Sequence, residues 1–281
     1  MNHTKTVLLL GALTGLFLLV GYAIGGNNGM LIALGFAGVF NFASYWFSDK
    51  IVLRAYGAAE LSESEAPQVH RMVRELAESA RIPMPRVYVI DQESPNAFAT
   101  GRNPQHAAIA LTRGIMSLMS QEQLRGVVAH ELSHVLSRDT LIQTVAATLA
   151  GAIMFLAQQM RFLAFFSGGH DDDDRGGNML GVLLMAILAP IAAMLIQLAI
   201  SRSREYKADA SAAQMTHQPE GLASALEKLE TYSKRVPLQA TSQTAHLFIV
   251  NPLSGKSLLA LFSTHPPIAE RVARLRQMRI A

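Results

Sequence analysis

Three residues in the segment "RGVVAHELSHVLSRD", residues 125–139, have the types and the spacing that metal chemistry requires: His130, Glu131 and His134. Residues four apart on an α-helix project from the same face, one turn from each other. His130 and His134 can therefore hold one ion, with Glu131 to the side of it. The rest of the segment is mostly apolar, and buried histidines need polar partners. We therefore predict a metal site on a buried helix.

The pattern is the H-E-x-x-H arrangement of zinc proteases. Zinc lowers the pKa of a bound water from about 15.7 to about 7 and polarises the scissile carbonyl. Glu131 can take the proton of that water as a general base and pass it to the leaving amine. An accidental match in a chain with nine histidines has a probability of about 0.01. The motif thus predicts a zinc endopeptidase with one zinc ion per chain.

A catalytic zinc needs a third protein ligand and one open position. The chain contains no cysteine, so this ligand must be a histidine or a carboxylate, and disulfides and thiol nucleophiles are excluded. The candidates that follow the motif are Glu205, Glu220, Glu227, Glu230, His217, His246 and His265.

Glu205 stands out among these candidates because Asp209 follows it by four residues, on the same helix face, in "SRSREYKADA". A carboxylate one turn beyond a ligand can accept the free ring N–H of a metal-binding histidine and so fix the tautomer of that ring. The same segment also fits an ordinary helix of mixed charge at a membrane interface. Spacing alone leaves both interpretations open.

The block before the motif, residues 55–139, is expected to be mixed α/β. Residues 62–82 have apolar positions at helical spacing, with Ser and Glu at the start as an N-terminal cap. Residues 86–91 alternate and are β-branched, which predicts a strand. Two more short strands are expected over 96–101 and 106–114, with "RNPQ" as the turn between them.

The metal-binding helix itself has a clear start signal. Ser120 is the expected N-cap and Gln123 stands at the third helical position, which together predict a capping box. After Glu205, two further helices are expected over residues 220–235 and 266–278.

Composition indicates membrane segments. Only 16% of the residues are charged, against about 25% in soluble domains. Residues 6–48 carry no charge, which is enough for two spans of ~20 residues, and "GGNNG" predicts the turn between them. A cleaved signal peptide is the alternative, but the apolar run continues far past an h-region. Residues 140–160 and 176–201 predict two further spans, with buried core helices as their alternative.

We therefore expect four blocks: a transmembrane hairpin (1–54), the first part of a protease domain (55–139), a second transmembrane hairpin (140–201) and the second part of the protease domain (202–281). Lys and Arg residues flank the predicted spans on one side. By the positive-inside rule, both termini and the motif should face the cytoplasm. The net charge of +3 reflects this flanking bias and requires no nucleic-acid partner.

The segments "SPNAFATG", "HELSHVLSRD", "SRSREYKADA" and "STHPPIAERVARL" occur in this order around two apolar hairpins. In this arrangement the chain resembles, over nearly its whole length, the HtpX family of membrane-bound zinc metalloproteases, which is related to the CAAX prenyl endopeptidases. The resemblance implies a mostly α-helical membrane protein with four transmembrane helices and a mixed α/β, zincin-like domain of the gluzincin type. It also implies Glu205 as the third zinc ligand and Asp209 as the residue that orients a histidine ligand.

The resemblance further implies a multi-pass protein of the bacterial inner membrane, in contact with lipid, whose site faces the cytoplasm. Its expected partners are polypeptides, above all misfolded or damaged membrane proteins under stress, which it hydrolyses without ATP. In agreement with this, the chain lacks the nucleotide-binding pattern G-x-x-x-x-G-K-[ST]. We expect no nucleotide and no nucleic acid as partner.

Two further site residues follow from the same resemblance. Asn96 opens "NAFAT", which resembles the edge strand beside the site where a peptide could add as a further strand; a plain sheet edge is the alternative. His265 in "THPP" is a candidate donor at the zinc site, and the alternative is a residue that caps the following helix.

Two other functions share these motifs. A CAAX-type prenyl endopeptidase would use the same site, although four spans are few for a chamber that holds a lipid-bearing tail. A membrane scaffold stabilised by zinc would bind the metal without an open coordination position and would hydrolyse nothing.

Overall fold

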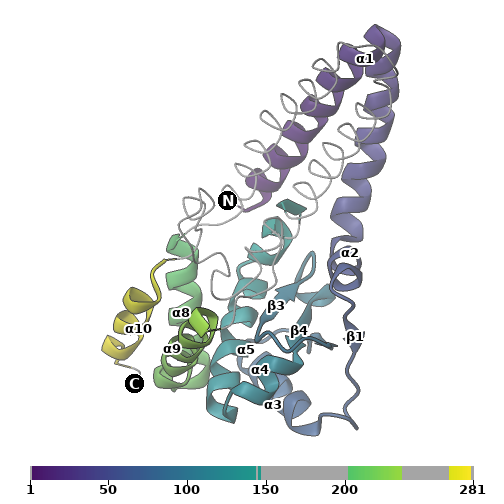
Figure 1. The fold of residues 1–281 in the computed structure, drawn as a ribbon. Coiled ribbons are helices and arrows are strands. Elements are labelled where there is room, and N and C mark those ends of the chain that lie inside the picture. The colour runs from purple at the N-terminus through teal and green to yellow at the C-terminus, as the bar shows by residue number, and fades with distance from the viewer. Residues whose placement is uncertain (1, 144, 147–201, 236–265, 280–281) are drawn as a thin grey trace, which may run out of the picture.

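The computed structural model describes residues 2–143, 145–146, 202–235 and 266–279. Figure 1 shows a helical hairpin that extends away from a body of helices and a small sheet. The expected mixed α/β class is confirmed for this body.

The hairpin is formed by α1 (Asn2–Trp46), which consists of two helices joined at a kink. Gly25 and Gly26 leave the helical conformation there, and Gly26 has a φ of 57° that glycine adopts without a steric penalty. The two legs lie against each other, since Asn41 Nδ2 donates a hydrogen bond to Thr14 Oγ1 at 2.9 Å. The chain therefore reverses within the "GGNNG" segment.

The second leg of the hairpin, Gly25–Trp46, is long and apolar enough to cross a membrane, and it is the one such helix among the described residues. Large apolar side chains are exposed along α1, among them Val7, Leu19, Leu31, Ile32, Phe36 and Val39. The expected spans over 140–160 and 176–201 lie outside the described residues, apart from helical turns over 140–143 and 145–146.

The described residues form a sheet of four strands in the order β1-β2-β4-β3. Their bounds are Ala59–Glu60 (β1), Arg86–Ile90 (β2), Ala97–Thr100 (β3) and Ala108–Thr112 (β4). β2 runs parallel to β4, whereas β3 is antiparallel to β4 with Ala97 opposite Leu111. The three predicted strands are confirmed, β1 was not anticipated, and β3 lies at one edge.

α3 (Pro67–Ser79) begins later than its expected cap. Its N-cap is Ala66, which makes no side-chain capping bond, and Pro67 occupies the first turn. Ser62 instead donates from Oγ to Glu65 Oε2 at 2.6 Å in the turn before the helix. The predicted Ser/Glu cap was therefore wrong: the fixed φ of Pro67 suits the first helical turn and sets the start there.

α5 (Gln121–Leu136) begins as expected. Ser120 Oγ accepts from the Gln123 amide at 3.3 Å, and Gln123 Oε1 accepts from the Ser120 amide at 3.1 Å, which confirms the capping box. A short helix, α4 (Arg113–Leu118), separates β4 from α5 and was not anticipated. The Thr112 hydroxyl caps it by accepting from the Ile115 amide at 3.2 Å.

α5 is the central element of the body, with the sheet against one side and two later helices against the other, while a third later helix packs on those two (Figure 1). These helices are α8 (Arg202–Thr216), α9 (Pro219–Arg235) and α10 (Ile268–Gln277). Val127, Val128 and Leu132 of α5 are fully buried in the main apolar core. The motif helix is therefore held rigidly on both sides.

Candidate metal centre

The two motif histidines meet on α5. The Nε2 atoms of His130 and His134 are 3.2 Å apart, and the residues are 3% and 4% exposed. Apolar neighbours fill the rest of the helix surface, so these two rings form a polar site inside the core. Two buried imidazoles in such an environment need a partner that compensates for their lost hydration.

α8 supplies that partner. Glu205, 1% exposed, lies with Oε2 at 3.6 Å from His130 Nε2 and with Oε1 at 3.5 Å from His134 Nε2. One ligand atom from each of the three residues lies within 4.8 Å of the others. Within the described part of the chain, no other group of histidine, cysteine and carboxylate side chains converges in this way.

The three side chains fit a catalytic metal ion. Two imidazole nitrogens and one carboxylate oxygen form a His₂Glu donor set, which zinc uses in catalytic sites with one position left open. Their convergence in a buried place has no other evident structural purpose, because a hydrophobic core gains nothing from three such groups alone.

The other candidates for the third ligand do not join this group. Glu220 and Glu227 instead form ion pairs with Arg276 at 2.7 and 2.8 Å. His217 and Glu230 also lie outside the cluster. His246 and His265 fall outside the described residues.

Each histidine has a carboxylate beside its second ring nitrogen. His130 Nδ1 lies 3.0 Å from Asp209 Oδ1, and His134 Nδ1 lies 3.4 Å from Asp139 Oδ2. Such carboxylates fix the tautomer and the ring orientation, so that Nε2 points to the ion. Asp139 was missed from the sequence, although it ends the quoted motif segment five residues after His134.

Sequence reasoning also missed Arg271, which is completely buried. Its Nε and Nη2 donate to Asp209 Oδ2 and Oδ1 at 2.8 and 2.7 Å, and its Nη1 lies 3.5 Å from Glu205 Oε2. A signal did exist: Arg271 shares the apolar face of α10 with Ile268 and Leu275, where a charged residue is unexpected.

The charges of these groups determine the protonation of the metal-free centre. Burial lowers the pKa of His130, but hydrogen bonds to the Asp209 and Glu205 carboxylates outweigh it and raise this pKa to about 9. Burial raises the pKa of Asp209, but the charge of Arg271 and the hydrogen bond with His130 bring it down to about 2. A metal ion that binds His130 must therefore displace a proton.

Glu131 points from α5 to the edge strand. It is 7% exposed, and its Oε2 accepts a hydrogen bond from the Ala99 amide at 3.0 Å. Burial raises the pKa of its carboxyl group. A carboxylate with a raised pKa is a stronger base than an exposed one, which suits a group that takes up and returns a proton.

Asn96 lies directly before β3 and is buried. Its amide donates to Thr112 Oγ1 at 2.8 Å and its carbonyl accepts from the Thr112 amide at 3.0 Å, so its backbone is fixed to the end of β4. Within the described part of the chain, no group donates a hydrogen bond to its side-chain Oδ1. The structure thus places a free acceptor at the start of the edge strand.

Comparison with known proteins agrees with this geometry. Residues 63–279 match the model of peptidase family M48. The chain belongs to this family. It is a metallopeptidase, as the H-E-x-x-H motif predicts.

Several similar relatives carry the name "Protease HtpX homolog". The one from Syntrophobacter fumaroxidans is 58% identical over 280 residues, which cover 99% of both chains. The one from Desulforapulum autotrophicum is 55% identical over 276 residues, which cover 98% of this chain and 89% of the relative. The expected resemblance to the HtpX family is confirmed.

A solved structure shows the same fold. The crystal structure of S. mikatae Ste24p aligns with a TM-score of 0.52 at 20% sequence identity. The alignment covers 98% of this chain and 65% of that chain, so this chain spans about two thirds of its length.

Proposed function

We propose that this M48 peptidase is a zinc endopeptidase of the bacterial inner membrane that hydrolyses misfolded or damaged membrane proteins on the cytoplasmic side. The observation that carries the proposal is the convergence of His130, His134 and Glu205 in a buried cluster with Glu131 beside it. This arrangement has the ligands and the base that metal-assisted hydrolysis needs, side by side.

His130, His134 and Glu205 would hold the zinc ion. When bound, zinc would supply Lewis-acid polarisation of the scissile carbonyl and a lowered pKa for water. Asp209 and Asp139 orient the two imidazoles through their second nitrogens. Arg271 keeps Asp209 ionised inside the core and so maintains that orientation.

Glu131 would take the proton from the attacking water and deliver it to the leaving amine. The Ala99 amide holds one carboxylate oxygen of Glu131 at 3.0 Å and leaves the other oxygen for this work. Because Ala99 belongs to β3, this hydrogen bond fixes the position of the Glu131 carboxylate relative to the edge strand.

A substrate peptide would bind as an additional strand at β3. This strand is the edge of the described sheet. Hydrogen-bonded and non-hydrogen-bonded pairs alternate along an antiparallel ladder, and the Thr112 amide donates to the Asn96 carbonyl. The backbone groups of Phe98, which pairs with Ala110, therefore face β4, and those of Ala97 and Ala99 face away from it. The Ala99 amide already donates to Glu131, so a peptide would pair with the Ala97 backbone groups and the Ala99 carbonyl, and Asn96 Oδ1 could accept a further hydrogen bond from it.

His265 would donate a hydrogen bond to the oxyanion that forms during attack. Two neighbouring facts support this role. Pro266, the next residue, is buried, and Arg271 of the same segment lies with Nη2 at 3.4 Å from His130 Nε2.

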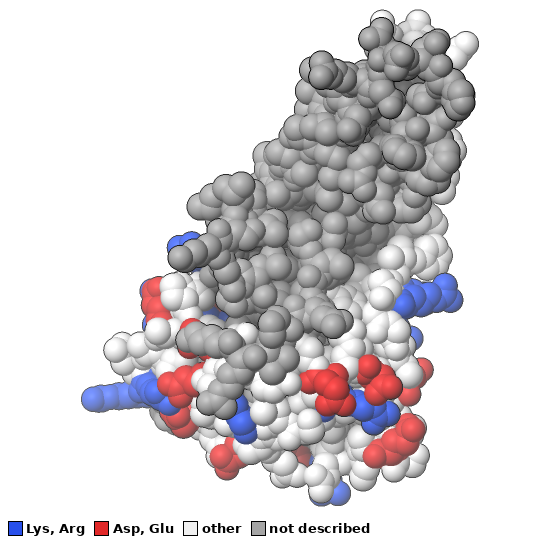
Figure 2. Space-filling model, in the orientation of Figure 1, with Lys and Arg blue, Asp and Glu red and all other residues white. Residues whose placement is uncertain are grey.

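The membrane placement is supported by the hairpin. Its large apolar side chains are exposed, which is unfavourable in water but favourable in lipid. Its uncharged segment is long enough to span a membrane. On the face seen in Figure 2, charged side chains gather on the α/β body, whereas the described tip of the hairpin shows none. Lys50 and Arg54, at the base of the hairpin, support a cytoplasmic position of the body, because the positive-inside rule favours basic residues on that side.

The decisive experiment is zinc analysis combined with a cleavage assay on the detergent-purified chain. A misfolded membrane protein and a prenylated peptide would serve as parallel substrates. The wild type should contain one zinc ion and cleave the membrane protein. Glu131→Gln should keep the zinc and lose about 10²–10⁴ in rate, whereas the exposed Glu122→Gln on the same helix should cleave normally. Zinc without any hydrolysis by the wild type would favour a scaffold.

A further inference from the structure

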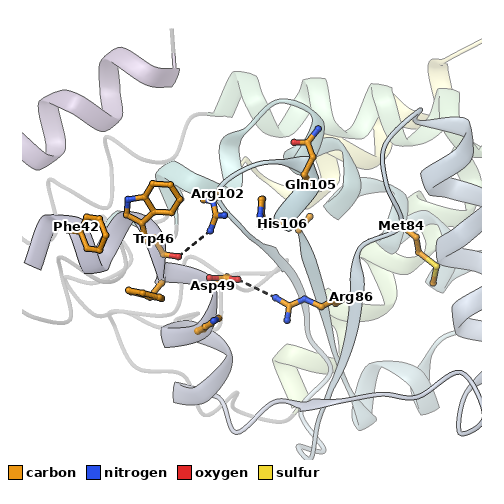
Figure 3. A pocket seen from close by; sticks show the side chains of 11 residues that line it. Phe42, Trp46, Asp49, Met84, Arg86, Arg102, Gln105 and His106 are labelled. Carbon is orange, nitrogen blue, oxygen red and sulfur yellow. Dashed lines mark hydrogen bonds and ion pairs between the residues drawn. The ribbon is translucent and has the colours of Figure 1, made fainter.

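A second site lies where the hairpin meets the sheet. A cavity of about 480 Å³ opens between the end of α1, α2 (Ser48–Ala55) and the sheet body (Figure 3). Its polar and aromatic lining includes Trp46, Phe47, Lys50, Arg86, Arg102 and His106. It is formed on the membrane side of the sheet by residues that the metal centre does not use.

The lining has an excess of positive charge. It contains three cations, Lys50, Arg86 and Arg102, and one carboxylate, Asp49. Asp49 pairs with Arg86 at 3.4 Å, which leaves two cations for an anion. The three cations come from three separate parts of the chain, so the flanking charge of one membrane helix does not explain their convergence.

The two remaining cations lie against aromatic rings. The Arg102 guanidinium lies 4.7 Å from the Trp46 ring centroid, and Lys50 Nζ lies 5.7 Å from that of Phe47. Arg102 also donates to the Trp46 carbonyl at 3.5 Å, which leaves most of its N–H groups available. Among the described residues, no carboxylate forms a salt bridge with either cation. Both are therefore held in place and still able to bind an anion.

The position of the cavity at the end of the apolar helix indicates which anion it binds. Trp46 ends the apolar helix Gly25–Trp46, and tryptophan marks the level of the lipid headgroups in membrane proteins. Phe42, one turn earlier in the apolar helix, lies on the membrane side of the same cavity. A ligand at this level meets cations at one end and an apolar surface at the other, which is the polarity of a phospholipid.

We propose that this cavity binds the headgroup phosphate of an anionic phospholipid. Arg102 and Lys50 contact the phosphate oxygens, Gln105 and His106 offer hydrogen bonds to the headgroup hydroxyls, and an acyl chain leaves along Phe42. The proposal rests on the membrane placement in the proposed function but not on proteolysis. Because Arg102 follows β3 after a single glycine, a bound headgroup would also fix the edge strand relative to the membrane surface.

The single tryptophan of the chain, Trp46, is a probe of this site. The full chain in zwitterionic detergent, carrying Glu131→Gln to prevent self-cleavage, would be titrated with phosphatidylglycerol, phosphatidylcholine or inorganic phosphate. Native mass spectrometry would count the retained lipids independently. We expect a saturable change in Trp46 emission and one retained lipid with phosphatidylglycerol, and at least tenfold weaker binding of phosphatidylcholine.

Variants locate the binding. Lys50→Gln with Arg102→Gln should weaken phosphatidylglycerol binding at least tenfold, and it keeps the Arg86–Asp49 pair. Arg102→Gln alone should also weaken the binding, and it serves in case the double variant fails to fold. The matched control, Arg74→Gln with Arg113→Gln, removes the same charge from exposed pairs with Glu63 and Asp91 and should bind normally.

Three results would overturn the proposal. Equal affinity for phosphatidylcholine would show that charge has no part, and normal binding by both cavity variants would place the lipid elsewhere. Saturation by inorganic phosphate at the same concentration as phosphatidylglycerol would assign a site for free anions. None of these outcomes affects the cleavage assay, so the proposed peptidase activity stands or fails separately.

Discussion

Arg271 and Asp209 form a bidentate pair, with Nε to Oδ2 at 2.8 Å and Nη2 to Oδ1 at 2.7 Å, although both residues are almost inaccessible to solvent. Asp209 in turn lies 3.0 Å from His130 Nδ1. A continuous polar chain thus joins α10, α8 and α5. The helix α10 is thereby connected to the orientation of a metal-binding ring.

Arg271→Met should destabilise the protein by about 3–5 kcal/mol, since removing one partner leaves a buried charge without compensation. Chemical unfolding of the metal-free protein in detergent would measure this loss. Arg276→Met on the same helix is the control, because its ion pairs with Glu220 and Glu227 are exposed. Equal unfolding curves for the two variants would mean that the buried pair does not support the fold.

Glu205→Ala should abolish tight metal binding, because it removes the one carboxylate of the cluster. Asp209→Asn should lower the affinity by about 10–100-fold, as expected for a residue that orients a ligand. Competition with a chelator would rank the variants. Glu220→Ala and Glu230→Ala should bind the metal like the wild type, and a metal-free Glu230→Ala protein would instead move the third ligand to α9.

His265→Ala should keep both metal and folding but lower kcat by about 10²–10³-fold, the effect of losing one oxyanion donor. A residue that only caps the helix start would behave differently: the melting temperature would fall and kcat per folded molecule would stay constant. Both quantities would be measured on one preparation. A less stable but fully active variant would refute the catalytic role.

The elements that carry the site could be predicted where local signals are strong. The Ser120–Gln123 capping box and the alternation in β2 depend on neighbouring residues alone, and both are present in the structure. The spacing of His130 and His134 is likewise local, because one helix positions both. Helix periodicity alone therefore predicts that the two side chains lie close together.

The misses have a common physical origin in tertiary structure. The role of Arg271 exists because α10 packs on α8. Its position on the apolar face of α10 indicates burial, but no local pattern identifies its partner on α8, and arginines in a helix are normally solvent-exposed. Asp139 gains its role only after the chain turns at Arg138, which has a φ of 55°. β1, with two residues, is too short to show a period.

A reporter fused after Ala281 and one inserted within "GGHDDDDRGG", residues 168–177, should lie on opposite sides of the membrane. The expectation follows from the basic residues near the predicted spans, which favour the cytoplasmic side. Paired alkaline phosphatase and fluorescent protein fusions would test it. Two cytoplasmic signals would reduce the protein to the α1 hairpin as its only membrane anchor.

The packing of α5 on α9 depends on Gly126. A Cβ built there would lie 2.6 Å from the backbone nitrogen of Leu222 and 2.8 Å from its Cα, which is closer than real contacts allow. On the other helix, a Cβ at Gly221 would lie 2.7 Å from the Glu122 carbonyl oxygen. The two backbones can therefore touch only because both residues lack a side chain.

Gly126→Ala should accordingly cost about 1–3 kcal/mol, the usual effect of overpacking, despite the gain of about 1 kcal/mol in helix propensity. Because His130 lies one turn further along α5, metal affinity should fall together with stability. Gly38→Ala is the control, since its Cβ would meet no atom within 4 Å, and with the same gain in helix propensity it should be at least as stable as the wild type. Chemical unfolding would measure the loss of stability, and competition with a chelator on the same samples would measure the loss of metal affinity. A Gly126→Ala protein as stable as the Gly38→Ala control would show that α5 and α9 have room between their backbones.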